Sequence, residues 1–113
     1  MPIDQQQIAR DFAQTINMGA DELEQWLTSD ASRSVGWKGK AGEAQESVGH
    51  ASGRRIVAIL RTAADDLTDE DYAHMRKTIG FIRRHKAQEP ANIFTSRWRY
   101  SLMNWGYDPL DNL

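Results

Sequence analysis

Cysteine is absent from the sequence, which excludes disulfides, thiolate metal sites, iron–sulfur clusters and cysteine nucleophiles together. No apolar run approaches the roughly 20 residues that span a bilayer, and the N-terminus lacks the basic and apolar regions of a signal peptide. The alternation of apolar and polar residues that is typical of strands is missing as well. We therefore expect a cytoplasmic, all-α protein that contacts no membrane.

The length and the composition indicate one folded domain. A chain of 113 residues, 40% hydrophobic and 27% charged, is large enough for one core and too small for two. We expect residues 1–113 to form a single-domain bundle of about five helices. Residues 28–42 are rich in Gly, Ser and Lys and have no periodicity, so they are predicted to form a flexible loop between the second and third helices.

Apolar residues at three- and four-residue spacings predict the helices. Asp4 is a suitable N-cap for the first, and Thr68 with Asp71 has the spacing of a capping box. Residues 23–27 and 32–35 also suggest a helix-turn-helix, but the following glycines would limit its second helix to about one turn. The expected helices are residues 4–16, a short helix from residue 19, residues 47–62, residues 68–86, and a last helix from residue 95 or 96 to residue 106.

Motifs of catalytic and metal sites are not found. The acids of residues 65–71 suggest calcium, but an EF-hand loop starting at Asp65 needs glycine and glutamate where Glu70 and Arg76 stand. His74 and His85 lie about 16 Å apart along one predicted helix, too far to share a metal ion. We therefore predict a protein that is not an enzyme and that has no catalytic residue, no metal ligand and no cofactor. A small-ligand or enzymatic site in the glycine-rich loop ranks last among the alternatives.

Charge is strongly segregated along the chain, although the net charge is only −2. Residues 33–61 carry a net charge of +4 and residues 76–99 a net charge of +6, whereas residues 1–32 and 62–75 carry −5 each. A fold that gathers the basic segments on one side would attract a polyanion through its local field, whatever the net charge.

The basic segments supply the candidate binding residues. Arg97 and Arg99 alternate with aromatic residues that can stack on bases. Gly49 and Gly53 have two interpretations: they allow two helices to pack closely, or, with Ser52 and the adjacent arginines, they accept a phosphate at a helix start. The predicted nucleic-acid-binding residues are Arg54, Arg55, Arg76, Lys77, Arg83, Arg84, Arg97 and Arg99.

Three segments resemble an uncharacterised family, domain of unknown function thirty-one-forty. They are Glu46-Ser47-Val48-Gly49-His50-Ala51-Ser52-Gly53-Arg54-Arg55-Ile56-Val57, Asp69-Glu70-Asp71-Tyr72-Ala73-His74-Met75-Arg76-Lys77 and Trp98-Arg99-Tyr100-Ser101-Leu102-Met103-Asn104-Trp105-Gly106-Tyr107-Asp108-Pro109. The resemblance implies a small bacterial or fungal protein, some of whose relatives are labelled DNA-binding. It assigns no functional residue.

Two hypotheses for the function follow. The first is a nonenzymatic nucleic-acid-binding domain whose basic helix faces contact phosphates, with DNA as the expected partner. The alternative is a protein-interaction or homo-oligomerisation module, in which the same bases meet an acidic partner or the acidic segments of a second copy.

Overall fold

The computed structural model describes residues 4–39, 45–91 and 96–111, and these residues form helices and connecting turns without a strand. The all-α prediction is confirmed, and five of the six α-helices have at least eight residues. The elements are α1 (Gln5–Thr15), α2 (Ala20–Leu27), α3 (Asp30–Ser34), α4 (Val48–Leu60), the 3-10 helix η1 (Ala64–Asp66), α5 (Asp69–Lys86) and α6 (Arg97–Asn104).

Polar side chains define where the helices begin. The Asp4 carboxylate accepts hydrogen bonds from the first-turn amides of α1. Thr68 and Asp71 form the predicted capping box, in which each side chain accepts a hydrogen bond from the other residue's backbone amide. Ser96 caps α6, while its alternative, Thr95, lies outside the described residues. At the other end of α6, Gly106 has a φ of 92°, the left-handed conformation that commonly ends a helix.

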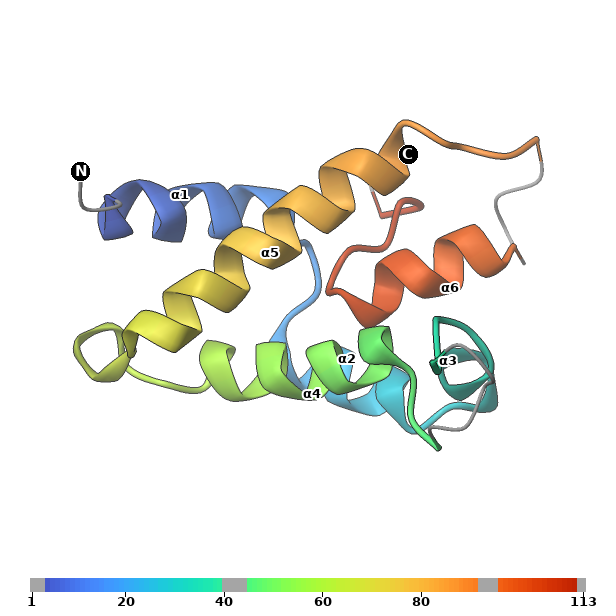
Figure 1. Ribbon diagram of the computed structural model, residues 1–113, viewed down its shortest axis with the longest axis horizontal. Coiled ribbons are helices and arrows are strands. Elements are labelled where there is room, and N and C mark those ends of the chain that lie inside the picture. Colours follow the sequence, from blue (N-terminus) through green and yellow to red (C-terminus); the bar gives the residue numbers. More distant parts are fainter. Residues whose placement is uncertain (1–3, 40–44, 92–95, 112–113) are drawn as a thin grey trace.

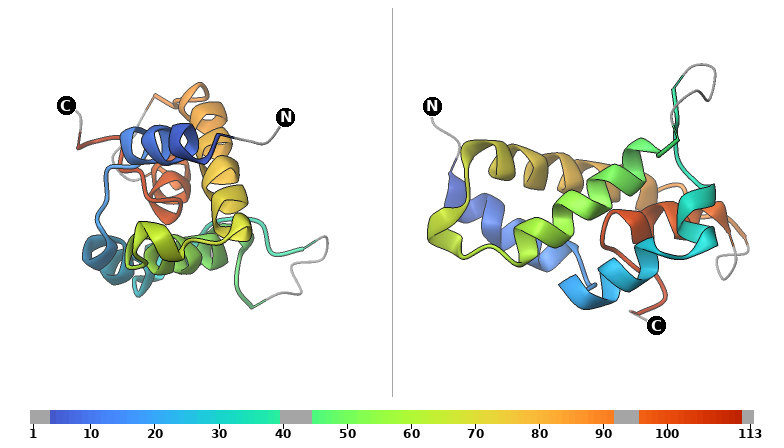
Figure 2. Two further views of the ribbon diagram at one scale, coloured as in Figure 1. Left: turned by 90° about the vertical axis from the view of Figure 1, so that its left-hand side faces the viewer. Right: turned by 90° about the horizontal axis from the view of Figure 1, so that it is seen from below.

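The helices form two stacked pairs. Helix α5 packs on α1 and α4 packs on α2, and Figure 2 shows the two pairs as separate layers. The turn containing η1 joins the layers at one end (Figure 1). Helix α6 lies toward the other end, where it contacts α2, α3, α4 and α5. The largest fully buried apolar side chains come from four helices and a connecting segment: Leu23, Val35, Ile56, Ile82 and Leu102.

The segment predicted as a loop contains a helix. Residues 30–34 form α3, which Ser29 caps by accepting a hydrogen bond from the Ser32 amide. The prediction of an uninterrupted loop over residues 28–42 is therefore wrong for α3, and residues 40–42 lie outside the described residues. Helix α3 follows α2 after a tight turn and has only five residues, in line with the limit of about one turn expected from the sequence. Its central Ser32 is buried, so the middle of this helix is closed to DNA.

Close approach of helices explains two glycines of α4. A Cβ on Gly53 would lie 2.5 Å from the backbone oxygen of Asn104 and 2.7 Å from a methyl group of Leu27. A Cβ on Gly49 would lie 3.1 Å from Nε1 of Trp105. The packing interpretation of both glycines is confirmed, because Gly53 lets α4 pass directly against the end of α6.

Crossing a bilayer requires a long apolar helix, and none of the helices within the described residues has that combination of length and hydropathy.

Two helical glycines should respond to alanine in opposite directions. Gly53→Ala should lower the free energy of unfolding by about 1 to 3 kcal/mol, because backbone and packed methyl groups block the new methyl group. Gly80→Ala in α5 should raise it by about 0.5 to 1 kcal/mol, because only the flexible end of Arg84 lies near that Cβ. Urea unfolding of both variants measures the difference, and equal effects would contradict the packing described here.

Candidate nucleic-acid interface

The eight predicted binding residues divide among three helices. Arg54 and Arg55 lie on α4, Arg97 and Arg99 lie on α6, and the other four lie on α5. All eight except Arg99 are exposed. The three groups differ in the hydrogen-bond and ion-pair partners that each cation has within the protein.

The α4 and α6 arginines have partners in the chain. Arg54 donates two hydrogen bonds to the Glu46 carboxylate, at 2.7 and 2.5 Å. Arg99 donates two hydrogen bonds of 3.1 Å to Asp108. Arg55 lies 3.3 Å from Asp71, and Arg97 donates to the backbone oxygen of Ser34 at 2.9 Å. These arginines hold segments of the fold together, so a ligand phosphate would have to compete with carboxylates for three of them.

The start of α4 was the second predicted phosphate site, and its amides are largely engaged. The Val48 amide donates to the backbone oxygen of Trp37 at 2.9 Å. The His50 amide donates to Oγ of Ser47 and the Ala51 amide to its backbone oxygen, both at 3.0 Å. Two of the three first-turn amides that would attract a phosphate, those of Val48 and His50, are therefore used internally.

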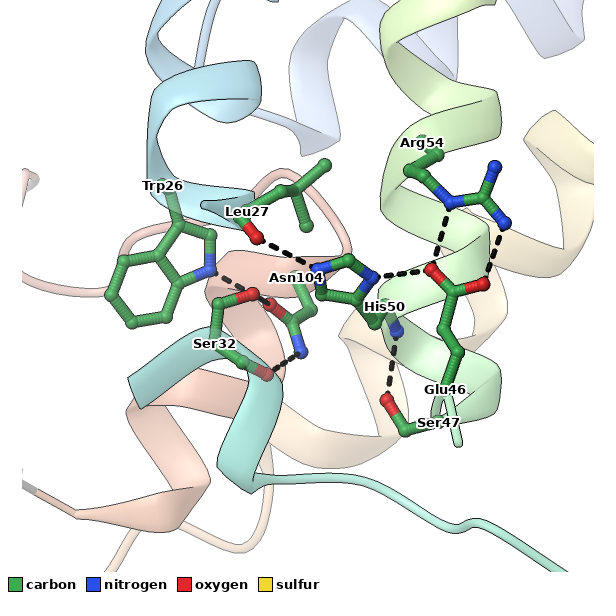
Figure 3. A network of polar contacts seen from close by, with 8 residues as sticks. All are labelled: Trp26, Leu27, Ser32, Glu46, Ser47, His50, Arg54 and Asn104. Atoms are coloured by element: carbon green, nitrogen blue, oxygen red, sulfur yellow. Dashed lines mark hydrogen bonds and ion pairs between the residues drawn. The ribbon is translucent and has the colours of Figure 1, made fainter. Parts of the chain in front are cut away.

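A polar network fastens the start of α4 to α2 (Figure 3). His50 lies between Leu27 and Glu46: its Nε2 is 2.7 Å from the Leu27 backbone oxygen, and its Nδ1 contacts the Glu46 carboxylate. Arg54 lies on the other side of the same carboxylate. The hydrogen bond from Arg54 and a weaker one from His50 lower the pKa of Glu46 to about 2, against the opposing effect of partial burial.

The aromatic residues beside the α6 arginines also belong to the fold. Nε1 of Trp98 donates to the backbone oxygen of His85 at 2.5 Å, and the ring of Tyr100 packs against Trp26 with 5.5 Å between centroids. Both side chains are half-buried. Trp98 and Tyr100, which were predicted as stacking surfaces between the cations, therefore pack against other parts of the fold.

Helix α5 differs, because its four predicted cations are exposed and none forms an ion pair within the described residues. Arg76 and Arg83 form one row and Lys77 and Arg84 a second, with about 10.5 Å between members of a row. Bases in the last turn of a helix also stabilise its dipole, a role that suits Arg83 and Arg84. Arg76 and Lys77 lie too far from the helix end for that explanation.

Two adjoining hollows lie beside the second row, between α4 and α5. The first, here called the aromatic hollow, has a volume of about 480 Å³ and is lined by Gly36, Trp37, Val48, Gly49, Lys77, Phe81, Arg84, His85, Ser101, Asn104 and Trp105. The second, here called the histidine hollow, is wider and is lined by Val48, Ala51, Ser52, Arg54, Arg55, Ala58, His74 and Lys77. Val48 and Lys77 line both, so the two hollows form one furrow.

Stacked rings line the aromatic hollow. Phe81 stacks on Trp105 with 4.2 Å between centroids and on His85 with 3.8 Å. Trp37 also lines this hollow and is 63% exposed. Sequence reasoning did not select Trp37 as a binding residue. The available signal was a large aromatic residue inside a segment without apolar periodicity, which offers it no helix face to bury.

The histidine hollow contains a serine–histidine pair. Oγ of Ser52 lies 2.8 Å from Nε2 of His74, and burial, together with the charges of Arg55 and Lys77, lowers the pKa of His74. The neutral imidazole that this favours carries one N–H, so its tautomer decides whether Nε2 donates to the Ser52 hydroxyl or accepts from it. Among the described residues no carboxylate hydrogen-bonds His74, so the third group that orients the base in a serine hydrolase is missing from this pair.

Over the described residues, the fold and this surface define a small helical protein whose longest helix carries a basic face without ion pairs. Residues 11–103 match the family described as "Protein of unknown function (DUF3140)", and the chain belongs to that family. The resemblance found in the sequence is thus confirmed. Comparison with curated proteins and with solved structures finds no match.

Acid should weaken the fold through Glu46. Because its pKa falls from 4.5 to about 2 on folding, its ion pair stabilises the protein above pH 4.5, and this stabilisation is lost as the pH falls from 4.5 toward 2. Glu46→Gln should remove that part of the pH dependence, measured as the change in urea midpoint between the two pH values. Glu22→Gln, at an exposed residue without an ion pair in the described structure, is the control. The same acid loss in wild type and Glu46→Gln would show that the pair contributes nothing.

Proposed function

We propose that this chain is a nonenzymatic nucleic-acid-binding domain in which α5 contacts the phosphates of DNA. The observation that carries the proposal is the set of four exposed α5 cations, none of which pairs with a carboxylate within the described residues. DNA presents one negative charge per about 1.7 Å of its axis, so the 10.5 Å between members of a row spans several phosphates.

The distribution of ion pairs supports a local positive field despite the net charge of −2. Arg61 binds Asp21 and Glu24, and comparable pairs occupy Asp71 and Asp108. Among the described residues five of the 16 acids, with Glu46 the fifth, thus form ion pairs with bases other than those of α5. Because the potential of exposed charges decays over roughly 10 Å at 0.1 M salt, a phosphate near the C-terminal half of α5 is influenced mainly by its cations.

One observation favours the alternative, self-association. Exposed acids gather at the opposite end of α5 and in the preceding turn: Asp65, Asp66, Asp69 and Glu70. This acidic end of one molecule complements the basic end of another. Self-association through these charges predicts a molecular mass that falls as salt rises in the absence of nucleic acid, and light scattering measures it.

Binding to random duplex DNA should weaken steeply with salt. Each neutralised phosphate contributes about −0.9 to the slope of log affinity against log salt concentration. Replacing Arg83 and Arg84 together with alanine should therefore lower affinity for unrelated duplexes about equally and make the slope shallower by roughly two units. Fluorescence anisotropy across a salt series measures both quantities.

The matched control is Arg54→Ala combined with Arg55→Ala. It removes the same charge from residues that already pair with Glu46 and Asp71, so the slope should change much less. Melting temperatures establish that both double variants fold. Equal effects of the two pairs would contradict the assignment to α5, and absence of duplex binding at low salt would refute the proposed function.

A further inference from the structure

We propose that the aromatic hollow receives one unpaired nucleobase, while Lys77 and Arg84 hold the phosphate attached to it. This inference rests on the proposed function and specifies its ligand: a strand with unstacked bases rather than an intact duplex. It is carried by the shape, the charge and the unused hydrogen-bonding capacity of the hollow.

The size and the walls of the hollow suit a flat ring. Its volume of about 480 Å³ falls in the range of small-molecule sites, roughly 300 to 1,000 Å³. Phe81 and Trp105 belong to one ordered stack that also includes His85 and His74, so the stack offers the hollow the edges of its rings. Val48, another lining residue, is 43% exposed and adds apolar surface that a ligand could cover.

Trp37 provides a stacking surface at the rim. Its backbone is fixed, because its carbonyl oxygen accepts the Val48 amide at 2.9 Å, while its side chain remains 63% exposed. The preceding Gly36 has a φ of 97°, and a Cβ there would lie 2.8 Å from Ser47. Glycine thus allows the chain to pass against the start of α4 and brings Trp37 to the edge of the hollow.

The charge of the hollow selects an anion. Its lining includes Lys77 and Arg84 and contains no carboxylate. Both cations lie on the same face of α5, and neither has an ion-pair partner within the described residues. A ligand that joins a planar ring to a negative group matches this combination of aromatic wall and cationic rim, and a nucleotide within a strand is such a ligand.

The indole N–H of Trp105 is a donor without a partner. Trp105 is only 3% exposed, yet its Nε1 makes no hydrogen bond among the described residues. Nε1 lies beside Gly49, 3.1 Å from where a Cβ would be, and both residues line the hollow. Since no buried side-chain donor of the described residues lacks a partner, the unbonded Nε1 opens to the hollow, where the ring nitrogens and carbonyl oxygens of a nucleobase can accept its proton in a hydrogen bond.

A base inside a duplex cannot occupy this site without leaving its stack. Extrusion costs unpairing and unstacking, a cost that a single strand largely avoids. Phosphate contacts by α5 are available to both kinds of nucleic acid, whereas the hollow adds affinity for the single strand alone. The structure therefore assigns the two rows of α5 different roles: Arg76 and Arg83 lie outside the hollow, and Lys77 and Arg84 lie on its rim.

The test measures the affinity of the full chain for a labelled thymidine strand of about ten nucleotides, for a duplex of equal length, and for an abasic strand with the same phosphates. Trp37→Ala should weaken binding of the thymidine strand roughly 5- to 150-fold, the range expected for one lost base stack, and leave duplex and abasic affinities unchanged. Trp37→Phe should retain most of the affinity. The exposure of Trp37 allows these variants to fold, and melting temperatures verify it.

A charge-matched comparison tests the rim. Lys77→Ala with Arg84→Ala should abolish the preference for the thymidine strand over the abasic strand, whereas Arg76→Ala with Arg83→Ala should weaken all three ligands and keep the preference. If the thymidine and abasic strands bind equally, or Trp37→Ala weakens every ligand alike, the hollow does not take a base and the proposed function still stands. If none of the three binds at low salt, the proposed function itself fails.

Discussion

The amide side chain of Asn104 is the contact on which the arrangement of the helices depends. It is 1% exposed, and its oxygen accepts hydrogen bonds from Nε1 of Trp26 and from Oγ of Ser32, while its nitrogen donates to the Ser32 backbone oxygen. Figure 3 shows it between α2 and α3. Its own backbone oxygen lies against Gly53 of α4. One residue therefore fixes the end of α6 against three other helices, and each buried group it satisfies would otherwise cost about 1 to 3 kcal/mol.

The position of Asn104 determines what its neighbours do. Trp105 follows it directly and stacks on Phe81 of α5, so the same helix end that joins α2, α3 and α4 also forms one wall of the aromatic hollow. Gly106 then turns the chain, and its backbone oxygen accepts the amides of Asn17 and Met18 between α1 and α2. The C-terminal motif that carries the family resemblance thus builds the fold, and the candidate binding surface lies beside it, on α5.

Sequence periodicity and start signals predicted α1, α2, α4, α5 and α6, because each shows an apolar face or begins at a recognisable cap. Helix α3 was missed, since five residues show no period. Charge patterns located the bases but not their partners: Arg54 meets a carboxylate eight positions away, and Arg55 meets one sixteen positions away. Such pairings depend on how α4 lies against its neighbours, which no local pattern contains. Trp37 was not predicted as a binding residue for the same reason, because its exposure follows from a turn against the start of α4.

The geometry of an α-helix separates two roles within one basic segment. Successive residues point about 100° apart, so Arg76 and Lys77 cannot face the same neighbour although they adjoin in sequence. The seven-residue interval returns almost to the same direction, which aligns Lys77 with Arg84 along the furrow and Arg76 with Arg83 away from it. Counting basic residues along the sequence does not distinguish these four cations. Among the described residues only the row of Lys77 and Arg84 lines the aromatic hollow, so the proposed base-dependent contact and the proposed phosphate-only contact belong to different faces of the same helix.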